Sequence, residues 1–260
     1  MKKIILAVVT LALTVSGTNL FAQGKYGKDS TECIKYLSYY TEYYKQKSYD
    51  EALPNWRKAY KFCPPTASQN LLIHGATLMK RAISKSAGNP ALRQEQVDSL
   101  MDIYDVRIKN YPKTRETAMN NKAIDLNNYV KNDNKRLHDT FTEVIDALKE
   151  KTNPTVFLFD LNAAIGLYQE GELTAEDIIN IYQTSMEYLN AAKPESDADA
   201  EKLANIKSDV ESLFISSKVA SCDNLIALFT PRFEADPNNL ELVSNIVRMM
   251  SITEGCTSND

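Results

Sequence analysis

Four cysteines and two histidines are the residues of this 260-residue chain that most readily do chemistry. The cysteines, Cys33, Cys63, Cys222 and Cys256, could form disulfides, bind a metal or remain free thiols. If all four are bonded, three pairings are open. No two of them are spaced as Cys-x-x-Cys, which disfavours a zinc site. The choice between disulfides and buried thiols depends on the compartment and on the helices that carry them.

The histidines do not belong to a catalytic motif. His74 lies among apolar neighbours and is expected to pack in the core. His138 precedes Asp139, but adjacent helical residues do not face each other, so this pair is a poor dyad. The sequence contains no Gly-x-Ser-x-Gly, no His-Glu-x-x-His and no glycine-rich phosphate loop. We therefore expect a protein that is not an enzyme and that holds no cofactor and no metal.

The first 22 residues have the pattern of an export signal. Lys2 and Lys3 precede an apolar run, Ile4–Val15, and a polar stretch then leads to Ala22. This order predicts a signal peptide over residues 1–22, cut after Ala22. The apolar core of about a dozen residues is shorter than the roughly 20 that span a bilayer. We expect no transmembrane segment after cleavage, and a protein that is periplasmic, associated with the outer membrane or secreted.

Charge is unevenly spread along the chain. The formal net charge is −4, and 43% of the residues are hydrophobic, so global disorder is disfavoured. Residues 170–260 hold 6 basic and 17 acidic residues, whereas the preceding part is mildly basic. This distribution gives little support for nucleic acid as a partner. Solvated helix faces are the favoured explanation of this uneven charge.

Apolar residues recur at helical spacing through nearly all of the chain after Thr31, and prolines mark the boundaries. Capping residues are expected at Asn153, Thr174, Asp197 and Asn239. No alternating pattern typical of strands competes. The sequence predicts eleven helices, at about 30–46, 49–62, 67–86, 92–110, 114–130, 134–150, 155–169, 174–192, 197–216, 221–235 and 239–252.

The second of these helices carries the most specific pattern. If Pro64 closes the unit, then Ala52, Trp56 and Ala59 fall on its small, aromatic and small positions. Small residues let two helices approach, and an aromatic side chain fills the space beside them. Residues 33–66 closely resemble a tetratricopeptide repeat (TPR) in this respect. The same register places Tyr36, Tyr39 and Tyr43 on the large packing positions of the preceding helix, and Tyr40 departs from the pattern.

The resemblance implies the fold. An exported bacterial TPR protein would be all-α, a right-handed superhelix of stacked TPR-like hairpins. The closing proline recurs at Pro112 and Pro237, while residues between 113 and 194 keep the hairpin rhythm without the signature. We therefore expect N-terminal TPR hairpins over 23–112, degenerate hairpins over 113–194 and C-terminal hairpins over 195–260. The helix at 239–252 would open a further hairpin, but no second helix follows it. Either the natural chain continues, or a partner covers this end, or the end is frayed.

The hairpins select one pairing of the cysteines. Cys33 lies near the start of one helix and Cys63 at the end of the next, and these ends are neighbours in an antiparallel hairpin. Cys222 opens a helix and Cys256 follows the next one, so they fall at the same edge. We predict Cys33–Cys63 and Cys222–Cys256 disulfides, with buried free thiols as the alternative.

Candidate binding residues come from two clusters. The resemblance implies an inner wall that includes Ile34, Leu37, Thr41 and Tyr44. Six tyrosines lie between 36 and 49, and Tyr40 and Tyr44 are the ones that packing does not require, so we expect them on the surface. Asn121 and Asn128 are seven residues apart and share a helix face, where their amides could hydrogen-bond a peptide backbone; a solvated face is the alternative.

The function that fits these patterns is binding. We expect a non-enzymatic TPR scaffold that mediates protein–protein interaction in the cell envelope or outside the cell, with a protein or peptide partner. The alternative is a glycan-binding module that uses exposed tyrosines, because TPR hairpins also form the framework of sugar-capturing outer-membrane lipoproteins. The absence of a cysteine just after the apolar leader argues against the lipoprotein form.

Overall fold

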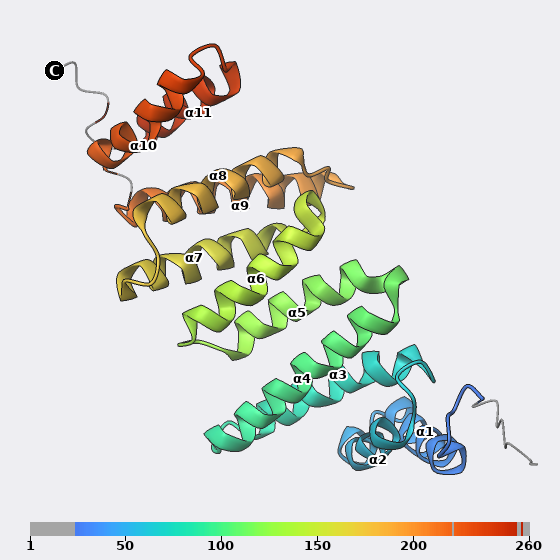
Figure 1. Cartoon of the computed structure of the whole chain (residues 1–260). Coiled ribbons are helices and arrows are strands. Elements are labelled where there is room, and N and C mark those ends of the chain that lie inside the picture. The colour runs from blue at the N-terminus through green and yellow to red at the C-terminus, as the bar shows by residue number, and fades with distance from the viewer. Residues whose placement is uncertain (1–23, 220, 254–255, 257–260) are drawn as a thin grey trace, which may run out of the picture. The chain divides into compact units, whose positions relative to one another are not determined.

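The computed structural model describes residues 24–219, 221–253 and 256, and all regular structure in this part of the chain is helical. It contains eleven α-helices and two short 3-10 helices (Figure 1). The predicted signal peptide and residues 257–260 lie outside the described residues. No helix among the described residues is long and apolar enough to cross a membrane. The chain divides into two compact units, with the boundary between Ala67 and Ser68.

The first unit is a single helical hairpin. Helix α1 (Ser30–Lys45) packs against α2 (Tyr49–Phe62). The predicted small, aromatic and small positions of α2 form its core: Ala52, Trp56 and Ala59 are all buried. Between the helices, Lys47 adopts a positive φ of 59° and allows the tight reversal.

The tyrosine faces of α1 differ from the prediction. Tyr40 is 1% exposed, whereas Tyr39 and Tyr43, which were expected to pack, are 50% and 38% exposed. Cys33 is buried and bonds to Cys63, the residue that follows α2. Tyr40 follows Cys33 by two helical turns and so shares its inward face. Tyr36 is half-buried and stacks on Phe62 at 5.9 Å, so the register taken from Pro64 holds at this position and is wrong at Tyr39, Tyr40 and Tyr43.

The second unit contains nine α-helices within its described residues. Successive helices pack against each other from α3 to α9, and α7 also contacts α5 and α9. Helix α10 packs on α11 and contacts α8. The bounds are α3 Gln69–Lys85, α4 Pro90–Asn110, α5 Arg115–Tyr129, α6 Asn134–Leu148, α7 Pro154–Glu170, α8 Ala175–Ala191, α9 Asp197–Ser216, α10 Cys222–Ala235 and α11 Leu240–Ile252; the 3-10 helices are η1 Pro112–Thr114 and η2 Lys149–Lys151.

Local capping explains most of these boundaries. Asn153 and Asn239 cap α7 and α11, and Thr174 forms a capping box with Asp177 at the start of α8. Ser196, not Asp197, caps α9, because its hydroxyl accepts the amide of Asp199 while Asp197 is already helical. Helix α4 starts at Pro90, two residues earlier than predicted, because Asn89 caps it and proline is accepted in the first turn.

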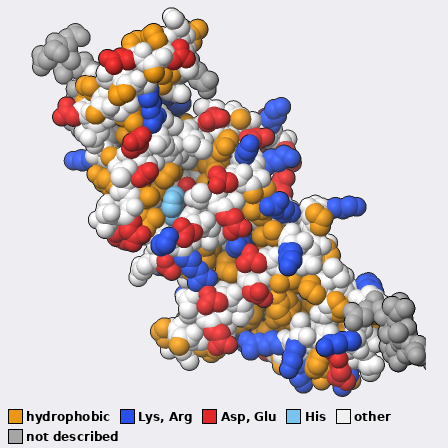
Figure 2. Space-filling view, viewed as in Figure 1, with side chains coloured by type: hydrophobic (Ala, Val, Ile, Leu, Met, Phe, Trp, Pro, Cys, Tyr) orange, Lys and Arg blue, Asp and Glu red, His pale blue; other side chains and the backbone are white. Residues whose placement is uncertain are grey.

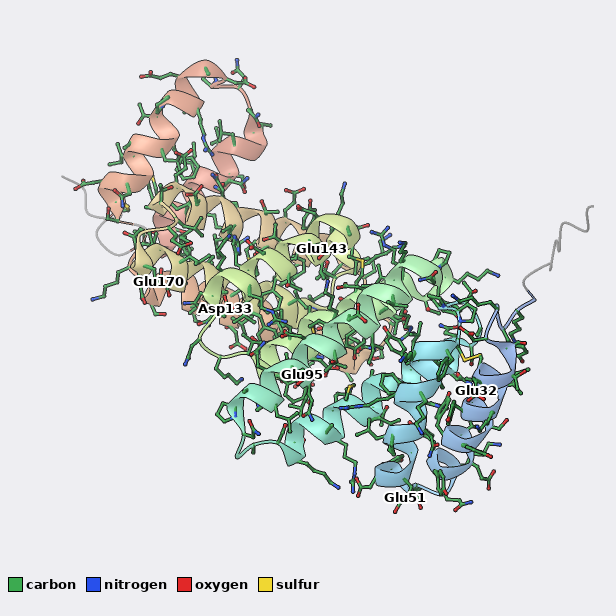
Figure 3. The ribbon with its side chains drawn as sticks, turned by 60° about the horizontal axis from the view of Figure 1, so that its bottom comes forward. Glu32, Glu51, Glu95, Asp133, Glu143 and Glu170 are labelled. Carbon is green, nitrogen blue, oxygen red and sulfur yellow. A yellow bond between two sulfur atoms is a disulfide. The ribbon has the colours of Figure 1, made fainter. Side chains whose placement is uncertain are left out.

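The core of the second unit is centred on α7. Most of its side chains are apolar, and neighbouring helices cover the greater part of its surface. Gly166 lets α6 approach α7 closely, because a Cβ at this position would collide with the side chain of Asn134. The amide of Asn134 in turn donates to Glu170 at the end of α7 (2.8 Å), and Glu170 is labelled in Figure 3.

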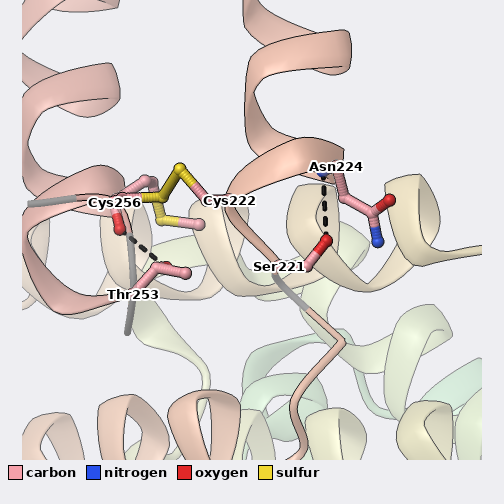
Figure 4. Close-up of a disulfide and its surroundings, with 6 residues drawn as sticks. Ser221, Cys222, Asn224, Thr253 and Cys256 are labelled. Atoms are coloured by element: carbon pink, nitrogen blue, oxygen red, sulfur yellow. Dashed lines mark hydrogen bonds between the residues drawn. A yellow bond between two sulfur atoms is a disulfide. The ribbon is translucent and has the colours of Figure 1, made fainter. Parts of the chain in front are cut away.

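Both predicted disulfides are present. Cys33 and Cys63 close the first hairpin with a Cα–Cα distance of 4.8 Å. Cys222 and Cys256 close the last hairpin with a Cα–Cα distance of 5.1 Å (Figure 4). Two disulfides in one chain indicate an oxidising compartment. The division of the chain at residues 112 and 194 stays a prediction.

Candidate binding cleft between α8 and α11

The residues expected to bind do not form one site. Tyr40 is buried in the first unit and cannot offer its ring to a ligand. Tyr44 is half-buried, with its ring 5.2 Å from that of Tyr49. Asn121 and Asn128 are both exposed on α5, in the second unit. Both face solvent from the same side of α5.

Two other asparagines of α5 have clearer roles. Asn120 is structural: its Oδ1 accepts the backbone N–H of Asn153 (2.7 Å), and its Nδ2 donates to the carbonyl of Lys151. Asn127 lines a hollow of about 430 Å³ between α5, α6, α7 and α9. Asn134, Asn162 and Lys131 line the same hollow, above a floor of apolar side chains. The sequence predicted binding amides on α5, but at the positions next to these two asparagines.

A larger cleft, of about 520 Å³, lies between α8 and α11. Helix α8 contributes most of its lining, and α11 supplies the opposite wall. Amides dominate the polar part, and two buried methionines form an apolar base. The lining residues are Asn180, Tyr182, Gln183, Thr184, Met186, Glu187, Asn190, Asn245, Arg248 and Met249.

Tyr182 gives this cleft its most unusual feature. The residue is 1% exposed, and its ring stacks on Phe214 of α9 at 4.2 Å between centroids. Its hydroxyl is buried and makes no hydrogen bond of normal geometry, with the guanidinium of Arg248 as the nearest polar group that acts on it. Burial raises the pKa of this hydroxyl to about 12, although the nearby Arg248 guanidinium opposes the shift. A buried hydroxyl without a well-formed hydrogen bond costs free energy, which Arg248 can offset by donating to it.

The charges around the cleft are nearly balanced. The ion pair between Arg248 and Glu211 of α9 is long, at 4.0 Å, so the Arg248 guanidinium retains donors for a ligand. Glu187 lines the same cleft from α8. At one end, Arg232 of α10 bonds to Glu176 (3.0 Å) and to Asn180 (3.5 Å), which ties α10 to α8. The cleft therefore favours a ligand with both donors and acceptors over a purely anionic or cationic one.

Buried ionic groups elsewhere in the second unit connect helices. Tyr104 of α4 donates to Asp125 of α5 (2.5 Å), and Lys80 of α3 pairs with the same carboxylate at 3.1 Å. Burial and Asp125 raise the pKa of Tyr104 far above its ordinary range. Lys122 of α5 bridges Asp105 of α4 (2.6 Å) and Glu143 of α6 (3.3 Å), the latter labelled in Figure 3. These contacts hold α3 to α6 in register.

A histidine–aspartate pair was missed from the sequence. His138 of α6 has its Nδ1 2.7 Å from the carboxylate of Asp160 on α7. The hydrogen bond to Asp160 raises the pKa of His138, while burial raises the pKa of Asp160. Asp139, which follows His138 in the sequence, is exposed and pairs with Lys135 instead. The available signal was Asp160 itself, an acid inside the apolar run of α7, which needs a partner when buried.

The described residues hold no group of three or more His, Cys, Asp or Glu side chains that could bind a metal ion. The side chains that line the cleft offer hydrogen bonding, charge, aromatic contact and apolar contact. Comparison of this chain with protein families, curated proteins and solved structures yields no match. The structure shows an all-helical protein in which successive helices pack in pairs.

Proposed function

We propose that this protein is a non-enzymatic scaffold of the cell envelope or secreted fraction that binds an extended segment of another protein in the α8–α11 cleft. The observation that supports this most is that four amide side chains line one cleft together with Arg248 and Glu187. An asparagine or glutamine amide offers one donor group and one acceptor, which matches the N–H and C=O of a peptide unit.

The spacing along α8 fits an extended chain. Asn180, Gln183, Glu187 and Asn190 recur at intervals of three or four residues and so form one stripe. Ten residues of helix span about 15 Å, which corresponds to roughly four or five residues of an extended peptide. Met186 and Met249 at the base would contact the ligand's side chains, because flexible thioethers adapt to different shapes.

The framework is consistent with this role. The first hairpin has the packing residues of a tetratricopeptide repeat, and such hairpins present helix faces to peptide ligands. The two disulfides agree with export through an oxidising compartment. Nucleic acid is an unsuitable ligand for this end of the chain, which is strongly acidic overall.

Site-specific photo-cross-linking in intact cells tests the proposal. A photo-reactive amino acid at Gln183, inside the cleft, should give a discrete adduct with one protein. The same amino acid at Ser99, an exposed position on α4, is the matched control. Asn245→Ala should reduce the Gln183 adduct by about tenfold if the amide contributes about 1.4 kcal/mol to binding. Equal adducts from Gln183 and Ser99, or an unchanged adduct in the variant, would refute a specific cleft.

One observation favours a second candidate, a glycan-binding surface on α1. Tyr39 and Tyr43 are exposed, and Tyr36 beside them stands 6.2 Å from Tyr39 in an edge-to-face pair. The ammonium groups of Lys35 and Lys58 each lie 5.0 Å from the Tyr36 ring, so an acidic glycan would meet both aromatic and cationic groups. Glycan-array binding that is lost with Tyr39→Ala but kept with Tyr44→Ala would support this surface, and absence of any glycan binding would exclude it.

A further inference from the structure

An apolar groove runs between α10 and α11, on the opposite side of α11 from the cleft. Its volume is about 380 Å³, and all of its lining side chains except Thr230 and Glu234 are apolar. The lining comprises Ile226, Phe229, Thr230, Phe233, Glu234, Val243, Ile246, Val247 and Met250. Figure 2 shows hydrophobic side chains reaching the surface over this hairpin, near the top of the view.

The groove has the form that receives a helix. On α10, Ile226, Thr230 and Phe233 lie at intervals of four and three residues. On α11, Val243, Val247 and Met250 repeat the same intervals. Two such stripes on antiparallel helices bracket a channel into which a third helix can place apolar residues at the same spacing. Val247 is 62% exposed and Ile226 47%, although burying each side chain would stabilise the protein by about 1.5–3 kcal/mol.

The groove is pre-formed. The Cys222–Cys256 disulfide joins the start of α10 to the residues that follow α11, so the two walls cannot separate at that end (Figure 4). Ser221 caps α10 by accepting the amide of Asn224, and the amide of Cys256 donates to Thr253. A ligand that binds here meets walls already in place, which reduces the entropy lost on binding.

The charges of the hairpin specify the partner. Its two described cations are both turned toward other helices: Arg232 bonds to Glu176 of α8, and Arg248 faces Glu211 of α9. The other charged side chains described on this hairpin are acidic and exposed, namely Asp223, Glu234 and Asp236. Glu234 lines the groove itself, and Asp223 and Asp236 stand at the two ends of α10, so the groove wall attracts a helix with basic flanks. It also opposes a two-fold contact between copies, which would bring the same acidic residues together.

From this geometry and charge we infer that the α10–α11 groove binds an amphipathic helix of a partner protein, with apolar residues on one face and lysine or arginine beside them. The Thr257–Asp260 segment of the chain has no apolar side chain and so does not supply this helix. The groove is separate from the α8–α11 cleft, because α11 presents Asn245 and Met249 to the cleft and Val243 and Val247 to the groove. The partner segment in the cleft is extended, whereas the groove requires a helix.

Binding of two synthetic peptides to the disulfide-bonded protein tests the inference. Each peptide is about 14 residues long, which matches α10 at 1.5 Å per residue, and has leucine at the apolar positions. One carries lysine at all other positions and the other carries glutamate. The lysine peptide should bind at least about tenfold more tightly at low salt, and the difference should shrink as salt screens the charges. Equal affinities, or no binding of the lysine peptide, would overturn the inference.

Variants locate the binding. Val247→Lys should weaken binding of the lysine peptide by about tenfold or more, whereas Ile73→Lys, at an exposed apolar position on α3, should not. Ile226→Ser on the opposite wall provides a second variant if Val247→Lys alters folding, and circular dichroism with intact-mass analysis verifies the fold and the disulfide. An unchanged affinity in the groove variants refutes the site. A concentration-dependent dimer that Val247→Lys abolishes would show that a second copy is the occupant and would also refute it.

Discussion

The first hairpin, α1–α2, and the last, α10–α11, are closed by the same covalent device but differ in what they enclose. Their disulfides span similar lengths, 30 and 34 residues. In the first hairpin the disulfide lies beside a packed core of small and aromatic side chains, including Trp56. In the last hairpin only Leu225, Phe229 and Met249 are buried among the side chains described on its helices, and one side remains an apolar groove.

This difference shows that a disulfide does not specify how well a hairpin is packed. Alanines at positions 52 and 59 let α1 and α2 approach closely, so the core excludes water. At the last hairpin, Ile226, Phe233 and Val247 are large and turned outward. The disulfide then stabilises an arrangement that leaves apolar surface for a ligand. The core of the first hairpin is closely packed, whereas the exposed apolar groove of the last hairpin is suited to binding.

The largest expected difference concerns the aromatic residues at the two cores. Trp56→Ala should cost about 3–5 kcal/mol of unfolding free energy, because the packed surroundings cannot fill the cavity. Phe229→Ala should cost less, at most about 3 kcal/mol, because the groove beside it lets neighbours and water enter. Urea unfolding followed by far-UV circular dichroism measures both, and hydrogen exchange assigns each loss to its hairpin. Equal costs would contradict the proposed difference in packing.

The second prediction concerns reduction of the two disulfides in the folded protein. Cys33 and Cys63 are buried, whereas Cys222 and Cys256 are partly exposed. A mild thiol reductant should therefore open Cys222–Cys256 first, since thiol–disulfide exchange requires access to the sulfur. Timed alkylation with peptide mapping follows each pair. Because the loops are similar, loss of either disulfide should cost about 3–4 kcal/mol if chain entropy dominates. Faster reduction of Cys33–Cys63 would contradict the exposures described here.

The third prediction concerns the pH dependence of stability, which we expect to arise outside both hairpins. Neither hairpin contains a histidine, and the His138–Asp160 pair lies in the part of the sequence that separates them. The raised pKa of His138 means that its stabilisation is fully present below the ordinary pKa of 6.5 and is lost as the pH rises through the raised value. Asp139, Asp177 and Lys135 also act on this ring.

Asp160→Asn should therefore cost about 1 kcal/mol near pH 6, and the cost should shrink toward pH 9. His74 provides the control, because burial lowers its pKa and its contribution to stability rises with pH instead. Unfolding free energies of Asp160→Asn and of a protein in which His74 is substituted, each at several pH values, test the two slopes. A cost of Asp160→Asn that grows with pH would contradict a protonated His138.

The helices and disulfides could be predicted because their signals are local. Prolines and caps such as Asn153 and Thr174 mark helix ends within a few residues, and antiparallel neighbours bring Cys33 to Cys63. The buried face of α1 was within reach of the same signal, because Tyr40 follows the bonded Cys33 by two helical turns, but the register taken from Pro64 placed Tyr40 outside. The α8–α11 cleft joins helices far apart in sequence, and no spacing rule predicts such contacts. The His138–Asp160 pair joins the consecutive helices α6 and α7, but it depends on how their faces meet, which the sequence does not give.

The smallest expected effect tests the groove in isolation. Val247→Ser removes an apolar side chain that is already 62% exposed, so the unfolding free energy should change by no more than about 0.5 kcal/mol. Tyr43→Ser, at an exposed position of α1, should behave alike and serves as the control. Binding of a hydrophobic dye to the folded protein should fall with Val247→Ser, because that side chain lines the groove. A loss above about 1 kcal/mol would show that Val247 is buried in solution, and the last hairpin would then be packed as the first is.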